Sequence, residues 1–574
     1  MSLGNQLRRL FGAKKWAVAE GNSQDEDCPA HFFWGMRDIP MQEATQHFLV
    51  VGAPQSGKTM TIRLLMQSVI PFVGRGCGHR AFVYDAKREF LPLLAEMWGK
   101  EPVTLDPFDQ RGHPWDMAVD IATEADAAQL AGMLIPEEPH ASQRFFSDGA
   151  RDLLHAVLVS LIETSPGRWT FRDALLALED TQTINQIVHK SEDSVRIANR
   201  YMEDEKTLPS VVSTVATKLR PFSVVAGLWA NSKQKPISLT EWLNTEGVLV
   251  VASHPRYSES LRPLTQAIFR RVSDLVLSRP DTDPDEERPW RTWFFLDEVR
   301  EAGRLNGLHP LLNMGRSKGA CMVLGFQDIA GMQAEYGDKI ADEIAGQCAY
   351  KSFLRSGSQV TAKWAQEHLG QAERIRPKYS ESKSYSDAGL PAGSQESISY
   401  DYVVENAVLA SEITSIPAPD AENGLIGFHD APRRKAYRTQ TAWCWLMQNL
   451  WKPSEEVVKS VPKSIPRDAK EQKLRTWEEA DYQRLWPKEQ LEKEQARALR
   501  KGSCPPGSPR PEGTSPGQTH PGTPGAIGPG TFAEGGEPDR LGSGRSEAGA
   551  SGGKAKKTYD AKKADLFGIE PPGL

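Results

Sequence analysis

The sequence has few cysteines and no long hydrophobic run. Its six cysteines are scattered among 574 residues, without a CxxC pair or a neighbouring histidine cluster. A structural zinc site or a disulfide framework is therefore not expected, and the cytosol is the natural compartment. No stretch reaches the roughly 18 to 20 apolar residues of a spanning helix, and the best candidate, residues 153–162, is too short. Without a signal-peptide region at its start, the chain is not expected to cross a membrane by itself.

An excess of positive charge is also missing. The formal net charge is −6 and the pI is about 6.1, so the whole chain is not a general binder of polyanions. Any contact with nucleic acid must come from a local basic surface. A hydrophobic content of 39% and a charged content of 25% are typical of a soluble globular protein with some disordered sequence. The length predicts two or three domains.

The sequence does contain a phosphate-binding loop. The spacing G-x4-G-K-T occurs once, after the apolar run 47–51 and before apolar residues at helical spacing. A strand, a glycine-rich turn and a helix are the context that a P-loop requires. The predicted nucleotide-binding residues are Gly52, Ala53, Pro54, Gln55, Ser56, Gly57, Lys58 and Thr59. Lys58 is expected to contact the β- and γ-phosphates of ATP, and the Thr59 hydroxyl to bind Mg²⁺.

Strands and helices alternate around this loop. The predicted strands are residues 80–85, 102–106, 247–252, 292–298, 320–325 and 350–354. This alternation predicts an α/β fold with a mostly parallel sheet and helices on both faces. Residues 85–90 are expected at the carboxyl end of a strand, where open α/β sheets bind ligands.

Helical periodicity replaces the strand pattern between residues 124 and 239. The clearest helical segments are residues 124–134, 145–163, 171–179 and 210–222. A hundred residues are too many for an ordinary crossover connection. We therefore predict an inserted all-α domain, 124–239, which divides a nucleotide-binding domain into the parts 28–123 and 240–450.

Polar side chains at strand ends are the candidate catalytic groups. Asp297 is expected to hold the water shell of Mg²⁺ beside Thr59, and Glu298 to act as the general base. Two carboxylates after a strand are also common at a helix start. Gln327 follows the next strand and is expected to sense the γ-phosphate, although loop glutamines are usually only solvated. Arg316, before that strand, is predicted to act in trans on a neighbouring subunit's nucleotide, with Arg355 as the competitor; either could instead pair with a surface carboxylate.

The order of these segments resembles one family. The segments are the P-loop, YDAKREF at 84–90, LDPF at 105–108, FLDE at 295–298, and GFQD at 325–328 followed by Tyr336 and Gly337. Together they resemble the type IV coupling proteins, the TraD/TraG-type conjugation ATPases related to the FtsK and RecA-like DNA motors. The similarity covers roughly residues 45 to 430. It implies a RecA-like P-loop NTPase domain, an all-α domain inserted at the same place, and a hexameric ring.

The resemblance also implies partners. Such an ATPase recruits a relaxase–DNA complex and feeds single-stranded DNA or protein into a type IV secretion channel. An alternative is a receptor for secreted proteins with little DNA translocation, and a third is a nucleotide-dependent switch. Family members usually begin with two transmembrane helices, which this sequence lacks. Either a separate membrane protein anchors the chain, or its start attaches weakly at the inner membrane face, or it is a soluble variant.

The two ends of the sequence differ from its centre. Residues 1–27 combine an apolar stripe of about three turns with basic residues. The stripe suits a short membrane-surface or docking helix, but its shortness favours a frayed terminus. Residues 451–500 are predicted to form a charged helical linker. Residues 501–553 are dominated by Gly, Pro and Ser and are expected to be disordered. Residues 554–574 combine lysines with a small apolar cluster, and are expected either to bind a protein partner or to be a disordered end.

Overall fold

The computed structural model describes residues 28–138, 141–203, 206–283, 288–385, 391–487 and residue 489. The predicted amphipathic start 1–27, the tether 501–553 and the motif 554–574 lie outside these residues. The domain boundaries stay predictions.

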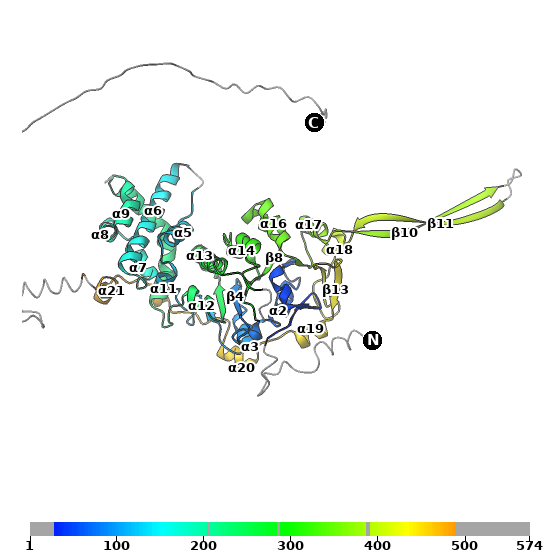
Figure 1. Cartoon of the computed structure of the whole chain (residues 1–574), viewed down its shortest axis with the longest axis horizontal. Coiled ribbons are helices and arrows are strands. Elements are labelled where there is room, and N and C mark those ends of the chain that lie inside the picture. Colours follow the sequence, from blue (N-terminus) through cyan, green and yellow to red (C-terminus); the bar gives the residue numbers. More distant parts are fainter. Residues whose placement is uncertain are drawn as a thin grey trace, which may run out of the picture. The chain divides into compact units, whose positions relative to one another are not determined.

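A nine-stranded sheet organises the described chain (Figure 1). Its strand order is β13-β12-β9-β3-β8-β7-β4-β6-β5. Every neighbouring pair from β9 to β5 is parallel, whereas β12 runs antiparallel to both β9 and β13. The strands are β3 (Phe48–Val51), β4 (His79–Asp85), β5 (Val103–Thr104), β6 (Val248–Ala252), β7 (Arg291–Leu296), β8 (Ala320–Phe326), β9 (Tyr350–Phe353), β12 (Leu425–Asp430) and β13 (Tyr437–Thr441). The predicted α/β fold with a mostly parallel sheet is confirmed.

The sequence predicts no strand after residues 350–354, and this is wrong. β12 and β13 extend the sheet beyond β9, and two further two-stranded sheets form outside it. One pairs β1 (His31–Trp34) with β2 (Arg37–Pro40), and the other pairs β10 (Gln371–Tyr385) with β11 (Pro391–Asn406). Among these strands, β13 and most of β10 and β11 are polar or exposed, so they lack the continuous apolar run by which the central strands were predicted.

Alternate residues of each central strand enter two different cores. Phe48 and Val50 of β3 belong to the cluster formed with α2 (Lys58–Met66) and α3 (Leu91–Trp98). Leu49 and Val51 belong to the other cluster, on the opposite face. This alternation is the period of two of a pleated strand, and it fixes the register because both faces are buried.

Helices cover the second face and continue into the helical region. Those nearest the sheet are α13 (Ser258–Leu277), α14 (Leu308–Met314), α15 (Ile329–Tyr336), α16 (Asp338–Gln347), α17 (Gln359–Leu369) and α18 (Ala410–Thr414). Those of the helical region are α4 (Met117–Asp120), α5 (Glu124–Leu134), α6 (Ala141–Thr164), α7 (Phe171–Leu176), α8 (Thr181–Val188), α9 (Glu192–Met202), α10 (Leu208–Leu219), α11 (Ser223–Ala230) and α12 (Leu239–Leu243). The predicted helical region is confirmed.

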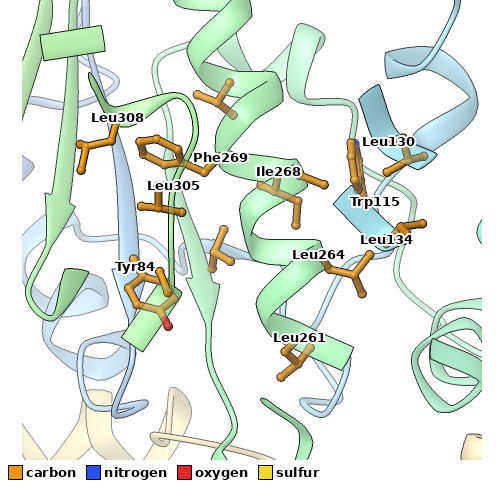
Figure 2. Close-up of a cluster of buried hydrophobic side chains, with 14 of the residues drawn as sticks. Tyr84, Trp115, Leu130, Leu134, Leu261, Leu264, Ile268, Phe269, Leu305 and Leu308 are labelled. Carbon is orange, nitrogen blue, oxygen red and sulfur yellow. The ribbon is translucent and has the colours of Figure 1, made fainter. Parts of the chain in front are cut away.

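Helix α13 joins the helical region to the sheet. Figure 2 shows Phe269 beside Leu305 and Leu308, and Leu264 on the side of α13 that faces Leu134 of α5. Side chains from the sheet and from the helical region therefore belong to one continuous hydrophobic cluster. A continuous core couples the two regions mechanically, because packed interiors transmit displacement.

Residues 442–487, which follow β13, run along the sheet region and the helical region; we call this segment the strap. The strap contains α19 (Trp443–Asn449), α20 (Glu455–Ser460) and α21 (Glu479–Leu485). Arg467 is its most enclosed cation, with a side chain only 3% exposed. Its guanidinium donates to the carbonyl oxygens of Asp109, Gly112 and Leu228. Leu485 is fully buried in the core, so this predicted linker is packed against the fold as far as it is described.

Two expectations about composition need correction. Cys28 and Cys77 form a disulfide with their Cα atoms 5.4 Å apart, although their separation of 49 residues gives no recognisable spacing. Within the described ranges, one stretch, Leu208–Ala230, is long and apolar enough to span a membrane by length and composition. Half of its apolar window is buried inside the fold, and core helices of a folded domain meet the same criterion.

Candidate functional site

The P-loop lies between β3 and α2, as its spacing predicts. Gly57 has φ 95° and a Cβ there would lie 2.2 Å from Leu425, so only glycine fits. Gln55 also has a positive φ of 60°. A Cβ on Gly52 would lie 2.3 Å from the Ser56 hydroxyl, so a larger residue would displace the turn. The loop therefore keeps the open curve from which backbone N–H groups and the start of α2 can hold an anion.

Lys58 and Glu298 form the central pair of the site. The Lys58 Nζ lies 2.7 Å from Glu298 Oε2, and the two side chains are only 7% and 5% exposed. Gln327 donates its amide N–H to the same oxygen at 3.1 Å. β3, β7 and β8 are neighbours in the sheet, so their parallel carboxyl ends bring these residues together although they are far apart in sequence.

Thr59 and Asp297 form a second pair beside the first. The Thr59 hydroxyl donates to Asp297 Oδ2 at 2.9 Å. Burial raises the pKa of Asp297, and the neighbouring charges of Lys58 and Lys87 oppose that rise. Its other oxygen, Oδ1, is buried without a hydrogen-bond partner among the described residues. A buried, unpaired carboxylate oxygen beside a hydroxyl is a donor set that suits Mg²⁺, so the residues fit the predicted cation.

A cavity of about 380 Å³ opens above the P-loop. Besides the loop itself it is lined by Met60, Lys87, Gln327, Pro419 and Trp443. Its volume is in the range of small-molecule sites. The lining combines the phosphate-binding loop and the Lys87 cation with the indole of Trp443, a composition suited to a nucleotide with a charged tail and a flat base.

Four residues that line this cavity are not among the predicted site residues: Met60, Lys87, Pro419 and Trp443. Lys87 was included only as part of a ligand loop; the fold of the loop turns it to the cavity, because Asp85 accepts the N–H groups of Glu89 and Phe90. Trp443 follows β13, and no motif marks it. The signal that could have found Lys87 was its place two residues after a buried strand that ends in an acid.

The two arginine candidates lie at opposite ends of the parallel strands, Arg355 at the carboxyl end and Arg316 at the amino end. Arg355 follows β9 and donates to the Pro54 carbonyl at 3.1 Å, so it contacts its own P-loop. Arg316 is exposed in the turn before β8, at the opposite end. Burial lowers the pKa of His47, just before β3, to about 4, and the charge of Arg316 adds to that lowering. Arg316 therefore cannot reach its own cavity, and its action in trans stays a prediction.

A parallel sheet with a P-loop after one strand, two carboxylates after another and a glutamine after a third defines a P-loop nucleotide-binding protein. The match to known families is more specific. Residues 34–432 match the model of the type IV secretion-system coupling protein DNA-binding domain, so the chain belongs to the type IV secretion coupling protein family. The family resemblance stated above is thereby confirmed.

Individual relatives agree with this assignment. The chain is 24% identical over 394 residues to the coupling protein TraD of Escherichia coli (strain K12), covering 66% of this chain and 51% of TraD. The chain thus spans about half the length of this curated relative. Among solved structures, the conjugative coupling protein TrwBΔN70 is similar, with a TM-score of 0.56, 18% identity, and coverage of 77% of this chain and 92% of that one. TrwB in complex with ADP and Mg²⁺ has a TM-score of 0.55 at 19% identity, covering 76% of this chain and 91% of that one. These structures show a shared fold.

Proposed function

We propose that this chain binds ATP with Mg²⁺ and hydrolyses it to drive a single-stranded DNA substrate, delivered with its relaxase, into a type IV secretion channel. The observation that carries the proposal is that Lys58 and Gln327, which both line the P-loop cavity, contact the same carboxylate oxygen of the buried Glu298. The family supports the substrate class, since the matched region is a DNA-binding domain. A nucleotide and Mg²⁺ are present in a TrwB structure of the same fold, which supports the cofactors.

Each side chain has a defined role in this proposal. Lys58 and the start of α2 bind the phosphates, and Lys87 adds a second positive charge from the cavity wall. Thr59 and Asp297 would hold Mg²⁺, which would supply positive charge against the phosphates. Glu298 accepts a proton from the attacking water, and Gln327 orients that water and senses the γ-phosphate.

The Lys58–Glu298 ion pair gives the site two states. While the pair is closed, the lysine that should bind phosphate is held by the carboxylate that should act as base. Binding of the triphosphate must move Lys58 towards the phosphates and release Glu298 towards water. Gln327 contacts Glu298 in the closed state, so it is placed to report the change.

We further propose that the working form is a homo-hexameric ring with the described core on the cytoplasmic side of the membrane. Exposure of Arg316 at the end of the strands opposite the cavity supports its use on a neighbour's nucleotide rather than its own. Single-stranded DNA would be held through its phosphates by a local basic surface, because the chain as a whole is acidic. Binding should therefore weaken as salt concentration rises.

The test is the ATP turnover of the purified chain with and without single-stranded DNA. We expect the DNA to raise kcat several-fold at low salt and to do so less at high salt. A chain that hydrolyses ATP at a rate unaffected by DNA, and binds none at any salt concentration, would refute the DNA part of the proposal. That result would favour a receptor for secreted proteins.

A further inference from the structure

The ribbon formed by β10 and β11 has two unlike faces. The strands pair antiparallel, with Ile375 opposite Tyr402, Pro377 opposite Tyr400 and Tyr379 opposite Ile398. Directly opposed residues of an antiparallel pair share a face. Figure 1 shows these strands as a two-stranded ribbon, and neither pairs with the nine-stranded sheet.

One face is apolar and exposed; we call it the apolar ribbon face. Six of its side chains are large and hydrophobic, and each is at least 55% exposed: Ile375, Tyr379, Ile398, Tyr400, Tyr402 and Val404. Together they expose on the order of several hundred Å² of surface, the size of patch that marks an interaction site. Single exposed hydrophobic residues are ordinary, but six on one face of one ribbon are not.

The other face is polar and closed on itself. Arg376 pairs with Glu405 at 2.5 Å, and Lys378 lies 4.0 Å from Asp401. The hydroxyls of Ser380 and Ser397 are hydrogen-bonded across the strands at 2.7 Å. Arg376 and Lys378 on this face are paired with acidic residues of the ribbon itself, so we take it as the solvated side.

A ribbon of this kind does not support itself. A two-stranded hairpin is marginally stable in water and needs packing on one face. The apolar ribbon face offers that packing surface, yet in the described chain its large side chains remain open to solvent. A partner that covers this face would stabilise the ribbon and remove the apolar surface from water.

The charges around the apolar ribbon face select the partner. Glu373 stands at the end of the face nearest α17, and Glu396 stands at the other end. The ten positions from 373 to 381 and 396 to 404 on this face include no lysine or arginine. Nucleic acid and anionic lipid need cations on the contacting surface, so this face suits neither. Face-to-face packing of two ribbons, in either direction, would bring glutamates together.

We propose that the apolar ribbon face is the docking surface for a separate protein, whose contact surface is apolar at its centre and carries Lys or Arg at its ends. Aromatic residues in the centre and charges at the rim are the composition of a protein–protein interface. This inference does not depend on ATP hydrolysis. It adds to the proposed motor a surface through which another protein is recognised.

The test places a photo-crosslinking amino acid, p-benzoyl-phenylalanine, at position 400 of the full chain in cells that contain its secretion system. The matched control places it at position 399, the neighbouring residue on the polar face. We expect a crosslink from position 400 and none from 399, to a protein other than this chain, at a segment with apolar residues flanked by Lys or Arg. Crosslinks to DNA, to lipid or to a second copy of the chain, equal crosslinking at both positions, or no crosslink at 400 would each overturn the proposal.

Two sets of variants separate docking from folding. The pair Tyr400→Thr and Tyr402→Thr keeps strand-forming residues but removes the aromatic rings. With the crosslinker placed at Ile398, we expect at least a tenfold loss of the crosslinked product, and ATP turnover of the purified variant unchanged. The pair Glu373→Lys and Glu396→Lys should cause a similar loss without changing the apolar centre. Unchanged crosslinking in either pair would contradict the proposed chemistry of the partner.

Discussion

Replacing Glu298 by Gln tests the chemistry of the site most sharply. The change removes the carboxylate that lies 2.7 Å from Lys58 but keeps the shape of the side chain. Loss of a general base typically lowers turnover by about 10²- to 10⁴-fold. Glu298 is only 5% exposed, so solvent does not supply an equivalent acceptor at that position.

The same variant should bind ATP more tightly. In the native protein the phosphates compete with Glu298 for Lys58, and a hydrogen bond to a charged group contributes about 1.5–3 kcal/mol. A neutral amide accepts a hydrogen bond from Lys58 less strongly than a carboxylate does. We therefore expect ATP binding to become more favourable by about 1 kcal/mol, which corresponds to a roughly fivefold lower Kd for ATP. A slowly hydrolysed analogue titrated into both proteins measures this, and phosphate release measures turnover.

The matched control is Glu301→Gln, the same chemical change at an exposed residue one turn further along the chain. It should leave ATP turnover and the Kd for the analogue unchanged. If Glu298→Gln keeps native turnover, Glu298 is not the base. If the variant loses turnover because it no longer binds the nucleotide, the carboxylate supports binding and the assigned role is wrong.

Three further predictions concern residues around the site. Lys87→Ala should raise the Kd for ATP by about tenfold, because it removes a cation that contributes about 1.4 kcal/mol to binding. Lys87→Arg keeps the charge and should have a Kd near the native value. Equal Kd values for the native protein and both variants would show that Lys87 does not bind phosphate. Arg467→Ala removes three hydrogen bonds to buried carbonyl oxygens and should lower the free energy of unfolding in urea by about 3 kcal/mol, with Arg467→Lys recovering only part. A native-like midpoint would show that the strap does not stabilise the fold. Burial raises the pKa of Asp106 to about 6 from 3.8, so the folded state favours the protonated carboxyl. The contribution of this group to the free energy of unfolding is complete below pH 3.8 and is lost as pH rises through 6. The stability of Asp106→Asn relative to the native protein should therefore increase by up to about 3 kcal/mol from pH 4 to pH 7 in urea unfolding, and a constant difference would contradict the raised pKa.

The sequence was informative wherever a residue's role follows from its local pattern. The P-loop needs glycine at position 57 because the backbone has a positive φ there, and this glycine is part of the G-x4-G-K-T motif that can be read from the sequence. The buried central strands are visible as apolar runs, so the carboxyl-end positions of Asp297 and Gln327 could be predicted. Their mutual distances follow from the parallel sheet.

The remaining features depend on long-range contacts that no local pattern marks. Trp443 reaches the cavity only because β12 and β13 add to the sheet beyond β9. Arg467 looks like one cation among many in a charged segment, and only the fold shows that it is enclosed between regions. The two faces of the β10–β11 ribbon depend on the register of strands joined through a turn, and a shift of one residue would have mixed them.

If hydrolysis drives DNA transfer, nucleotide state and DNA binding must be coupled through this site. The most direct measurement is the Kd of a fluorescently labelled single-stranded oligonucleotide, by anisotropy, with and without a non-hydrolysable ATP analogue and Mg²⁺. We predict that the analogue changes this Kd at least fivefold in the native chain and not at all in Lys58→Ala, since coupling between two ligands requires binding of both. The same Kd in the presence and absence of the analogue, in a native chain shown to bind it, would show that the nucleotide site is not coupled to DNA binding.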